Sequence, residues 1–94
     1  SIKPMEQIVT HYYLRFNVKD QPGVLAKIAG VLGDHEISIE SMVQPHRHEA
    51  EAVPIVFMTH AAEERNVNAA LAEINKMDVI HDETLLIRVE DHLE

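Results

Sequence analysis

The segment Asn17–Leu25, with the sequence NVKDQPGVL, combines residue types that could bind a small charged molecule. Pro22 and Gly23 separate an alternating segment from a helical one, so we expect a turn that leads into a helix N-terminus. Backbone N–H groups at such a terminus attract a carboxylate, and Gly23 would let a ligand approach the backbone closely. Asp20 would place a negative charge nearby, so the turn suits a zwitterion, with its carboxylate on the N–H groups and its ammonium on Asp20. Asp20 could also simply cap the helix, and the two roles can coexist.

The seven histidines are the obvious candidates for a metal site. His46 and His48 lie two residues apart in the polar segment Pro45–Glu51, which reads as a loop. A transition-metal site needs three or four converging ligands with supporting hydrogen bonds. We therefore expect a solvated loop there and predict no metal site.

Catalytic groups are also not indicated. The acidic pair Glu63 and Glu64 lies at the start of a predicted helix and does not face a second acid across a cleft, so we expect both side chains to be solvated. Ser38 and Ser41 have no His and Asp partners at a recognisable spacing. We predict no catalytic site in these 94 residues.

Four segments alternate between apolar and polar residues, and this period of two predicts half-buried β-strands. They span residues 11–18, 37–44, 53–58 and 85–89. Apolar residues at helical spacing predict one helix from Pro22 to about Asp34 and another that begins at Glu63 and Glu64 and ends near Met77. The order β-α-β-β-α-β favours an α+β, ferredoxin-like sandwich, in which a four-stranded antiparallel sheet carries two helices on one face.

The alternation also predicts which side of the sheet each residue occupies. We expect the core side to carry Tyr12, Leu14, Phe16 and Val18 from the first strand and Leu85, Ile87 and Val89 from the last. The other face would carry Tyr13, Arg15, Val56, Met58 and Leu86, a mixture apolar enough to suggest partial cover by a partner. The second and fourth strands would be edges. Only Glu40 protects the second one, so a second copy of the chain could pair with it.

Length and charge exclude several classes of protein. The chain has 94 residues, with 8 basic and 16 acidic side chains, a formal net charge of −8 and no cysteine. It is long enough for one domain, and it can form neither disulfides nor cysteine-based metal sites. No apolar run approaches the length of a membrane span, about 18 residues. The acidic charge argues against nucleic acid, and no glycine-rich nucleotide-binding motif is present. We therefore expect a cytoplasmic protein without a cofactor of its own.

The segment DQPGVLAKIAGVLGDHEISIESMVQ resembles the signature of ACT domains, in which a strand ends in a D-x-P-G-V-L turn that precedes a helix and an I-S-I-type strand. The resemblance covers residues 12–89. The segments HYYLR before the turn and SMVQ after it are similar in particular to segments of the C-terminal regulatory domain of homoserine dehydrogenases. This implies a regulatory domain over 11–90, a linker or the end of a catalytic domain over 1–10 and a charged tail over 91–94.

The resemblance also implies a function. ACT domains bind small metabolites, most often amino acids, and commonly pair through the second strand into a dimer with ligands at the seam. Threonine or a related amino acid would be the effector, and Ser38 would be a partner for its hydroxyl. The parent enzyme would convert aspartate semialdehyde to homoserine with NAD(P), which would bind outside these residues. Carried over by position, the site would comprise Asn17, Asp20, Gln21, Gly23, Val24 and Leu25, closed by Ser38 and Ile39 of the partner.

Two alternatives stay open: a dimerisation module without an effector site, and an ACT sensor attached to a different enzyme of amino-acid biosynthesis. One position departs from the family pattern, because His35 and Glu36 stand where a glycine often precedes the I-S-I strand. A left-handed Glu36 would cost about 1 kcal/mol. Otherwise Gly33 would end the helix earlier. Either outcome could shift the start of the second strand by a residue.

Overall fold

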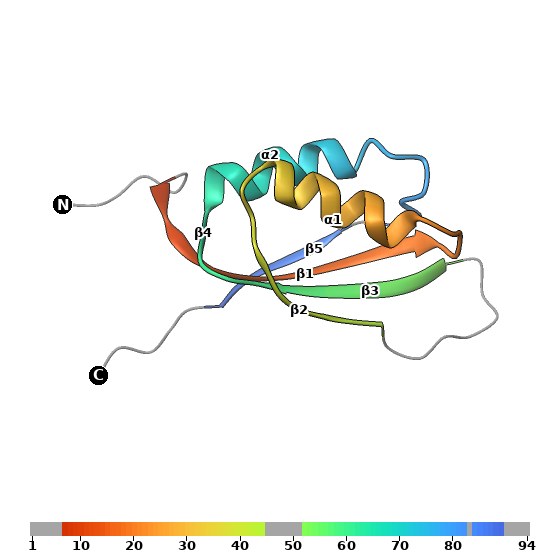
Figure 1. Cartoon of the computed structure of the whole chain (residues 1–94), viewed down its shortest axis with the longest axis horizontal. Coiled ribbons are helices and arrows are strands. Elements are labelled where there is room, and N and C mark those ends of the chain that lie inside the picture. Colours follow the sequence, from red (N-terminus) through yellow and green to blue (C-terminus); the bar gives the residue numbers. More distant parts are fainter. Residues whose placement is uncertain (1–6, 45–51, 83, 90–94) are drawn as a thin grey trace.

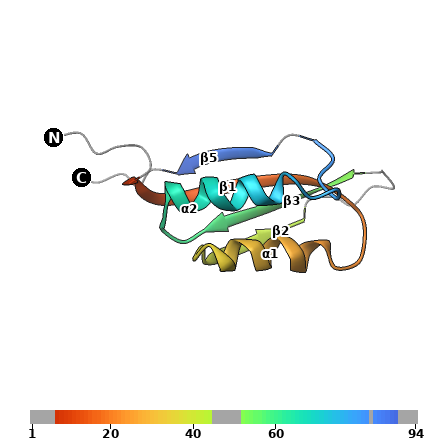
Figure 2. The ribbon, with the colours of Figure 1, turned by 90° about the horizontal axis from the view of Figure 1, so that it is seen from above.

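The computed structural model describes residues 7–44, 52–82 and 84–89. Its elements in chain order are β1 (Val9–Lys19), α1 (Val24–Asp34), β2 (Ile39–Val43), β3 (Ala52–Thr59), β4 (Ala62–Glu63), α2 (Glu64–Ile74) and β5 (Leu85–Val89). The five strands form an antiparallel sheet, and both helices lie on one of its faces (Figures 1 and 2). β1 is central: it pairs with β3 on one side and with β5 on the other, and β2 pairs with β3.

This architecture confirms the predicted ferredoxin-like α+β sandwich, with β2 and β5 on opposite sides of the sheet. β4 was not predicted, because a strand of two residues is too short to show alternation. It pairs with Val9 and Thr10, so β1 begins two residues before the predicted strand. The polar segment 45–51 and the tail 91–94 lie outside the described residues. Neither described helix has the length and apolar character to cross a membrane.

Alternate residues of β1 form the centre of the core, as predicted. Tyr12, Leu14 and Phe16 are fully buried, and Val18 is nearly so. The rings of Phe16 and Phe57 pack edge to face, with centroids 5.9 Å apart. The helices cover this layer with side chains at helical spacing: Val24, Ile28 and Leu32 from α1, and Val67, Ala70 and Ile74 from α2.

β5 presents the opposite face to the one predicted. Leu86 lies opposite Leu14 and packs against the core, whereas Leu85 and Ile87 are 45% and 47% exposed. The prediction that Leu85, Ile87 and Val89 face the core and Leu86 faces away was therefore wrong. The strand has the sequence LLIRV, so both of its faces are apolar apart from Arg88. Arg88 shares the helix side with Leu86, and there it binds a buried carboxylate.

The face of the sheet without helices is rich in apolar side chains, as expected. Val56 is buried, Tyr13 and Met58 are half-buried, and Arg15 is exposed among them. Leu85 and Ile87 extend this surface across β5, because they pair with Arg15 and Tyr13. Its cover by a partner stays a prediction.

α1 begins at Val24, later than the predicted start at Pro22. Gly23 occupies the N-cap position with a φ of 84°, a left-handed conformation that favours glycine. Pro22 therefore lies in the turn before the helix. Asp20 is three residues ahead of Gly23, so it is not the N-cap residue.

α1 ends in a Schellman motif built on Glu36, which has a φ of 62°. The N–H of Glu36 donates to the Gly33 carbonyl and that of Ile37 to the Leu32 carbonyl, both at 2.9 Å. The left-handed residue is thus Glu36, and the helix does not end at Gly33. β2 consequently begins only at Ile39, and its pairing with β3 shifts register between Ile39 and Ser41.

Candidate functional site

A hollow of about 160 Å³ lies where β1 leads into α1. Five of the predicted binding residues line it: Asp20, Gln21, Gly23, Val24 and Leu25. The rest of its wall comes from adjoining strand ends: Val18 and Lys19 of β1, Gln44 after β2, and Val53 and Ile55 of β3. Pockets for drug-sized ligands have volumes of about 300–1,000 Å³. This smaller hollow matches a small metabolite.

The start of α1 gives the hollow a positive end. The N–H of Lys27 donates to the Gly23 carbonyl at 3.0 Å and closes the first helical turn. The N–H groups of Leu25 and Ala26 precede this bond and have no acceptor within the helix. Together with the aligned peptide dipoles they act as about half a positive charge. A Cβ atom placed on Gly23 would meet no atom within 4 Å, so a ligand can reach the backbone there.

Three predicted site residues lie elsewhere in the chain. Asn17 is opposite Pro54 on the face of the sheet without helices, and its carbonyl accepts the N–H of His81 at 2.8 Å. Ser38 stands before β2, at the opposite end of that strand from the hollow, where its carbonyl accepts the N–H of His60. Ile39 is half-buried and packs against the core. A single copy therefore does not bring Asn17, Ser38 and Ile39 to the hollow.

Five residues line the hollow and were missed as site residues: Val18, Lys19, Gln44, Val53 and Ile55. The alternation of β3 assigned Val53 and Ile55 to the core side, where both are buried, but it could not show which strand end borders the turn. Gln44 belongs to the sequence SMVQ, which resembles the family, and this resemblance could have indicated Gln44 as a site residue. Only the folded sheet shows that this residue reaches the start of α1.

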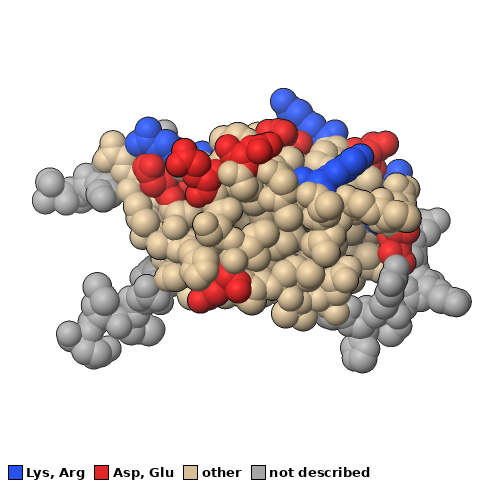
Figure 3. Space-filling model, in the orientation of Figure 1, with Lys and Arg blue, Asp and Glu red and all other residues tan. Residues whose placement is uncertain are grey.

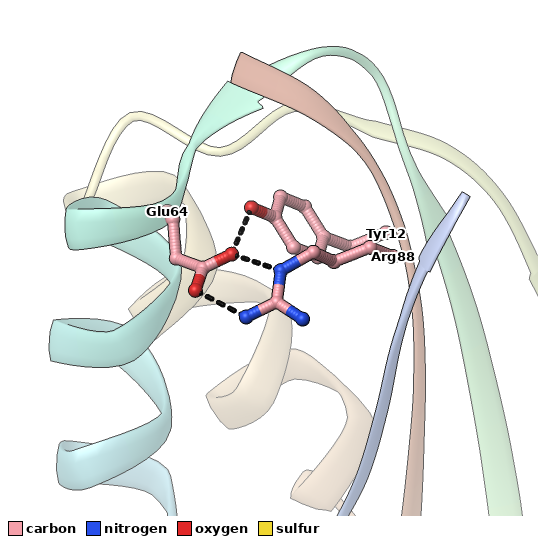
Figure 4. Close-up of polar contacts among 3 residues, drawn as sticks. All are labelled: Tyr12, Glu64 and Arg88. Carbon is pink, nitrogen blue, oxygen red and sulfur yellow. Dashed lines mark hydrogen bonds and ion pairs between the residues drawn. The ribbon is translucent and has the colours of Figure 1, made fainter. Parts of the chain in front are cut away.

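Glu64 forms a second polar cluster, at the opposite end of β1 from the hollow (Figure 4). The Tyr12 hydroxyl donates to Glu64 Oε1 at 2.8 Å, and Arg88 donates through Nε to Oε1 at 2.6 Å and through Nη2 to Oε2 at 2.5 Å. The Glu64 side chain is only 4% exposed. The expectation that Glu64 is solvated was therefore wrong, because a tyrosine and an arginine replace its water.

The same contacts shift the acid–base equilibria of the cluster. Hydrogen bonds from Arg88, followed by the one from Tyr12, outweigh burial and hold the pKa of Glu64 below its usual range. Burial and the neighbouring carboxylate raise the pKa of Tyr12. Glu64 is therefore a carboxylate and Tyr12 a neutral hydrogen-bond donor at neutral pH. Their arrangement fits a structural role that joins β1, α2 and β5.

Two histidines of the described ranges make contacts with distant parts of the chain. His35 Nε2 lies 3.0 Å from Glu73 Oε1 and links α1 to α2, and His11 Nδ1 lies 3.0 Å from the Thr59 carbonyl. In residues 7–44, 52–82 and 84–89, no three His, Asp or Glu side chains gather in a way that could hold a metal ion. The pair His46 and His48 lies outside these ranges.

Comparison with known proteins gives a consistent result. The model of the ACT domain family matches residues 12–79. A homoserine dehydrogenase of Neisseria gonorrhoeae is 36% identical over 90 residues, which make up 96% of this chain and 21% of that protein. The crystal structure of a homoserine dehydrogenase from Thiobacillus denitrificans matches with 45% identity and a TM-score of 0.86 over 97% of this chain and 20% of that one.

More distant structures share the fold alone. The regulatory subunit of aspartate kinase from Thermus thermophilus has 21% identity and a TM-score of 0.60, over 84% of this chain and 51% of that one. The chain spans about a fifth of the length of the homoserine dehydrogenases that it matches.

Proposed function

The chain belongs to the ACT domain family, and from that premise we propose that it binds a small amino acid, threonine foremost, and so regulates an attached homoserine dehydrogenase. The whole enzyme would convert aspartate semialdehyde to homoserine in the cytoplasm, with NAD(P) bound by another part of the protein. The described residues would contribute the sensor and no catalytic group.

The hollow at the start of α1 is the observation that carries this proposal. A carboxylate is attracted to the N–H groups of Leu25 and Ala26, which have no intrahelical acceptor. Asp20, on the same wall, supplies the negative charge that an ammonium group needs. Both charges of a zwitterion are thus met within one turn of chain, and the volume of about 160 Å³ leaves room for a short side chain.

We further propose that two copies pair through β2. Among the described strands, β2 pairs with β3 alone, and residues 40–43 are exposed. α1 runs along the same edge of the sheet (Figure 2). Charged side chains gather over the upper, helical rim of the molecule, whereas the flank below is largely uncharged (Figure 3). Leu25, Ala29 and Gly33 recur every four residues and so lie on one uncharged face of α1. Leu25 borders the hollow together with Gln44, so this face begins beside the end of β2.

A dimer of this kind would couple ligand binding to the enzyme. The hollow lies beside the β2 edge, so an amino acid bound there would bias how two copies pack. Such coupling between sites is typically about 1–3 kcal/mol.

A thermal-shift measurement with each of the twenty amino acids tests the sensor. A ligand at ten times its Kd should add about 1.4 kcal/mol to the free energy of unfolding. In a domain of this size each kcal/mol raises Tm by roughly 4–8 °C. We expect a clear rise with threonine. A rise with an unrelated amino acid alone would indicate a sensor for a different enzyme, and no rise on a folded dimer would indicate a dimerisation module.

A further inference from the structure

The helix-free face of the sheet, which is its lower side in Figure 1, exposes apolar side chains on both sides of the central strand. Leu85 and Ile87 of β5 are about half exposed, and so is Val43 of β2. Tyr13 lies between them on β1, where its cross-strand neighbours are Met58 and Ile87. An exposed apolar surface that continues over four strands is typical of a face that another protein covers.

Arg15 lies at the centre of this surface. It stands in one cross-strand row with Val43, Val56 and Leu85, which come from the three other strands. Its side chain is exposed, and no described residue forms a hydrogen bond or an ion pair with its guanidinium group. A guanidinium group binds both oxygens of a carboxylate with matching geometry. Arg15 is therefore suited to a carboxylate of a partner that covers the face.

The charge of this face differs from that of the whole chain, which has 16 acidic and 8 basic side chains. Among the described residues that β1, β3 and β5 place on the helix-free face, Arg15 and Lys19 are basic and none is acidic. A second copy packed face to face would thus bring another arginine and no carboxylate from these strands. Charge complementarity favours a different partner, whose surface is apolar and carries an acidic side chain.

We infer that this face packs against the attached dehydrogenase and that Arg15 binds a carboxylate of that enzyme. The inference rests on the proposed function. The chain spans about a fifth of the homoserine dehydrogenases that it matches, so a sensor in such a protein needs a surface that contacts the rest. The helices cover one face of the sheet, and the proposed dimer occupies the β2 edge. The helix-free face remains for the enzyme.

Arg15 is separate from the amino-acid hollow. It is not among the residues that line the hollow, and it points to the opposite side of the sheet from Val18, Val53 and Ile55, which do. A substitution at Arg15 should therefore disturb the contact with the enzyme without changing the binding of the amino acid. This difference allows binding and regulation to be tested separately.

The main test is Arg15→Glu, which would place two carboxylates opposite each other in the contact. Calorimetric titration of the 94-residue chain should give the same threonine affinity for this variant as for the wild type. In the whole enzyme, threonine should no longer change the activity of the variant, so the ratio of rates with and without threonine should return to one. Arg65→Glu is the matched control, because it reverses an exposed charge on α2 and should retain regulation.

Oxidation of Met58 by hydroxyl radicals gives a second readout that does not depend on a ligand. Met58 is half-buried on the helix-free face, so packing against the enzyme should cover it further. We expect slower oxidation in the whole enzyme than in the 94-residue chain. Arg15→Glu should restore the faster rate in the whole enzyme.

The possible results separate the inference from the proposed function. Wild-type regulation in Arg15→Glu, or equal oxidation of Met58 in the chain and in the enzyme, would overturn the inference. A change in the sedimentation of the 94-residue chain on Arg15→Glu would also overturn it and assign the face to a contact between copies. A folded wild-type chain that binds no amino acid, together with protection of Met58 in the enzyme, would overturn the proposed sensor and support the docking face.

Discussion

Tyr12 and Arg88 are cross-strand partners in the pairing of β1 with β5, and both side chains bind the carboxylate of Glu64. One buried group thereby joins the central strand, an outer strand and the first residue of α2. Removal of one member of a buried ion pair leaves a charge without compensation, which is more costly than replacement of the whole pair by apolar residues.

The variant Arg88→Met should therefore lower the free energy of unfolding, because it leaves the buried Glu64 carboxylate without its charged partner. Urea denaturation measures this change. Arg65→Met is the matched control, since Arg65 contacts Glu63 at 3.7 Å and both side chains are about half exposed. Equal costs for the two variants would contradict a structural role of the cluster.

The contribution of Glu64 should depend on pH. Its pKa is lower in the folded chain than the ordinary value of 4.5, so the folded state binds this proton less tightly than the unfolded state does. The stability that Glu64 provides is therefore present above that ordinary value and is lost as pH falls through the folded pKa. Denaturation at a series of pH values should show the stability difference between the wild type and Glu64→Gln shrinking on acidification. A constant difference would argue against this ionisation.

Glu36→Gly should stabilise the domain by about 1 kcal/mol, because glycine adopts a positive φ without the clash of a Cβ atom. The φ of 62° at Glu36 is the observation behind this expectation. Calorimetry should show a higher Tm. Glu36→Ala keeps the Cβ atom and serves as the control without a gain. A stabilisation of equal size in both variants would point to removal of the charge as the cause.

Asp20→Ala should weaken amino-acid binding about tenfold or more through loss of a charge-assisted hydrogen bond. The domain should stay folded, because Asp20 is exposed and is not the N-cap residue of α1. Titration of the effector, together with circular dichroism, checks both statements. Asp34→Ala is the control, because it removes an equivalent exposed charge at the other end of α1. Full affinity in the Asp20 variant would remove this residue from the site.

Ser41→Lys should dissociate the proposed dimer. Ser41 is the middle residue of the outer strand β2, so two added charges would lie close together in a paired seam. Sedimentation velocity would detect the monomer. Asn68→Lys places the same charge on the exposed side of α2 and should not affect association. A dimer that persists in the Ser41 variant would exclude the β2 seam.

The sequence predicted the parts of the fold that depend on local patterning. The alternation of β1 assigned Tyr12, Leu14 and Phe16 to the core, and the turn from Asp20 to Leu25 does border a hollow. The same period of two places Asn17 on the face of the sheet without helices, and the structure confirms that placement. Its assignment to the binding site stays a prediction.

The errors occurred where a residue depends on a distant partner. Glu64 at a helix start looks like an ordinary exposed acid, and its partners are 24 and 52 residues away in the chain. Arg88 turns toward this carboxylate and so reverses the side of β5 that faces the core. Gln44 lines the hollow only because folding brings the end of β2 to the start of α1.

The long central strand has a mechanical consequence. β1 has 11 residues and therefore extends over roughly 35 Å. It carries Tyr12 of the Glu64 cluster near its start and Val18 and Lys19 of the hollow at its end. Its first residues are anchored, because Thr10 Oγ1 donates to the Val89 carbonyl at 2.7 Å and the Ile8 carbonyl accepts the N–H of Glu64 at 2.9 Å. Its other end is held too, because the Lys19 N–H donates to the Val79 carbonyl at 2.8 Å. A strand fastened at both ends would carry a displacement beside the hollow along its whole length to the Glu64 cluster.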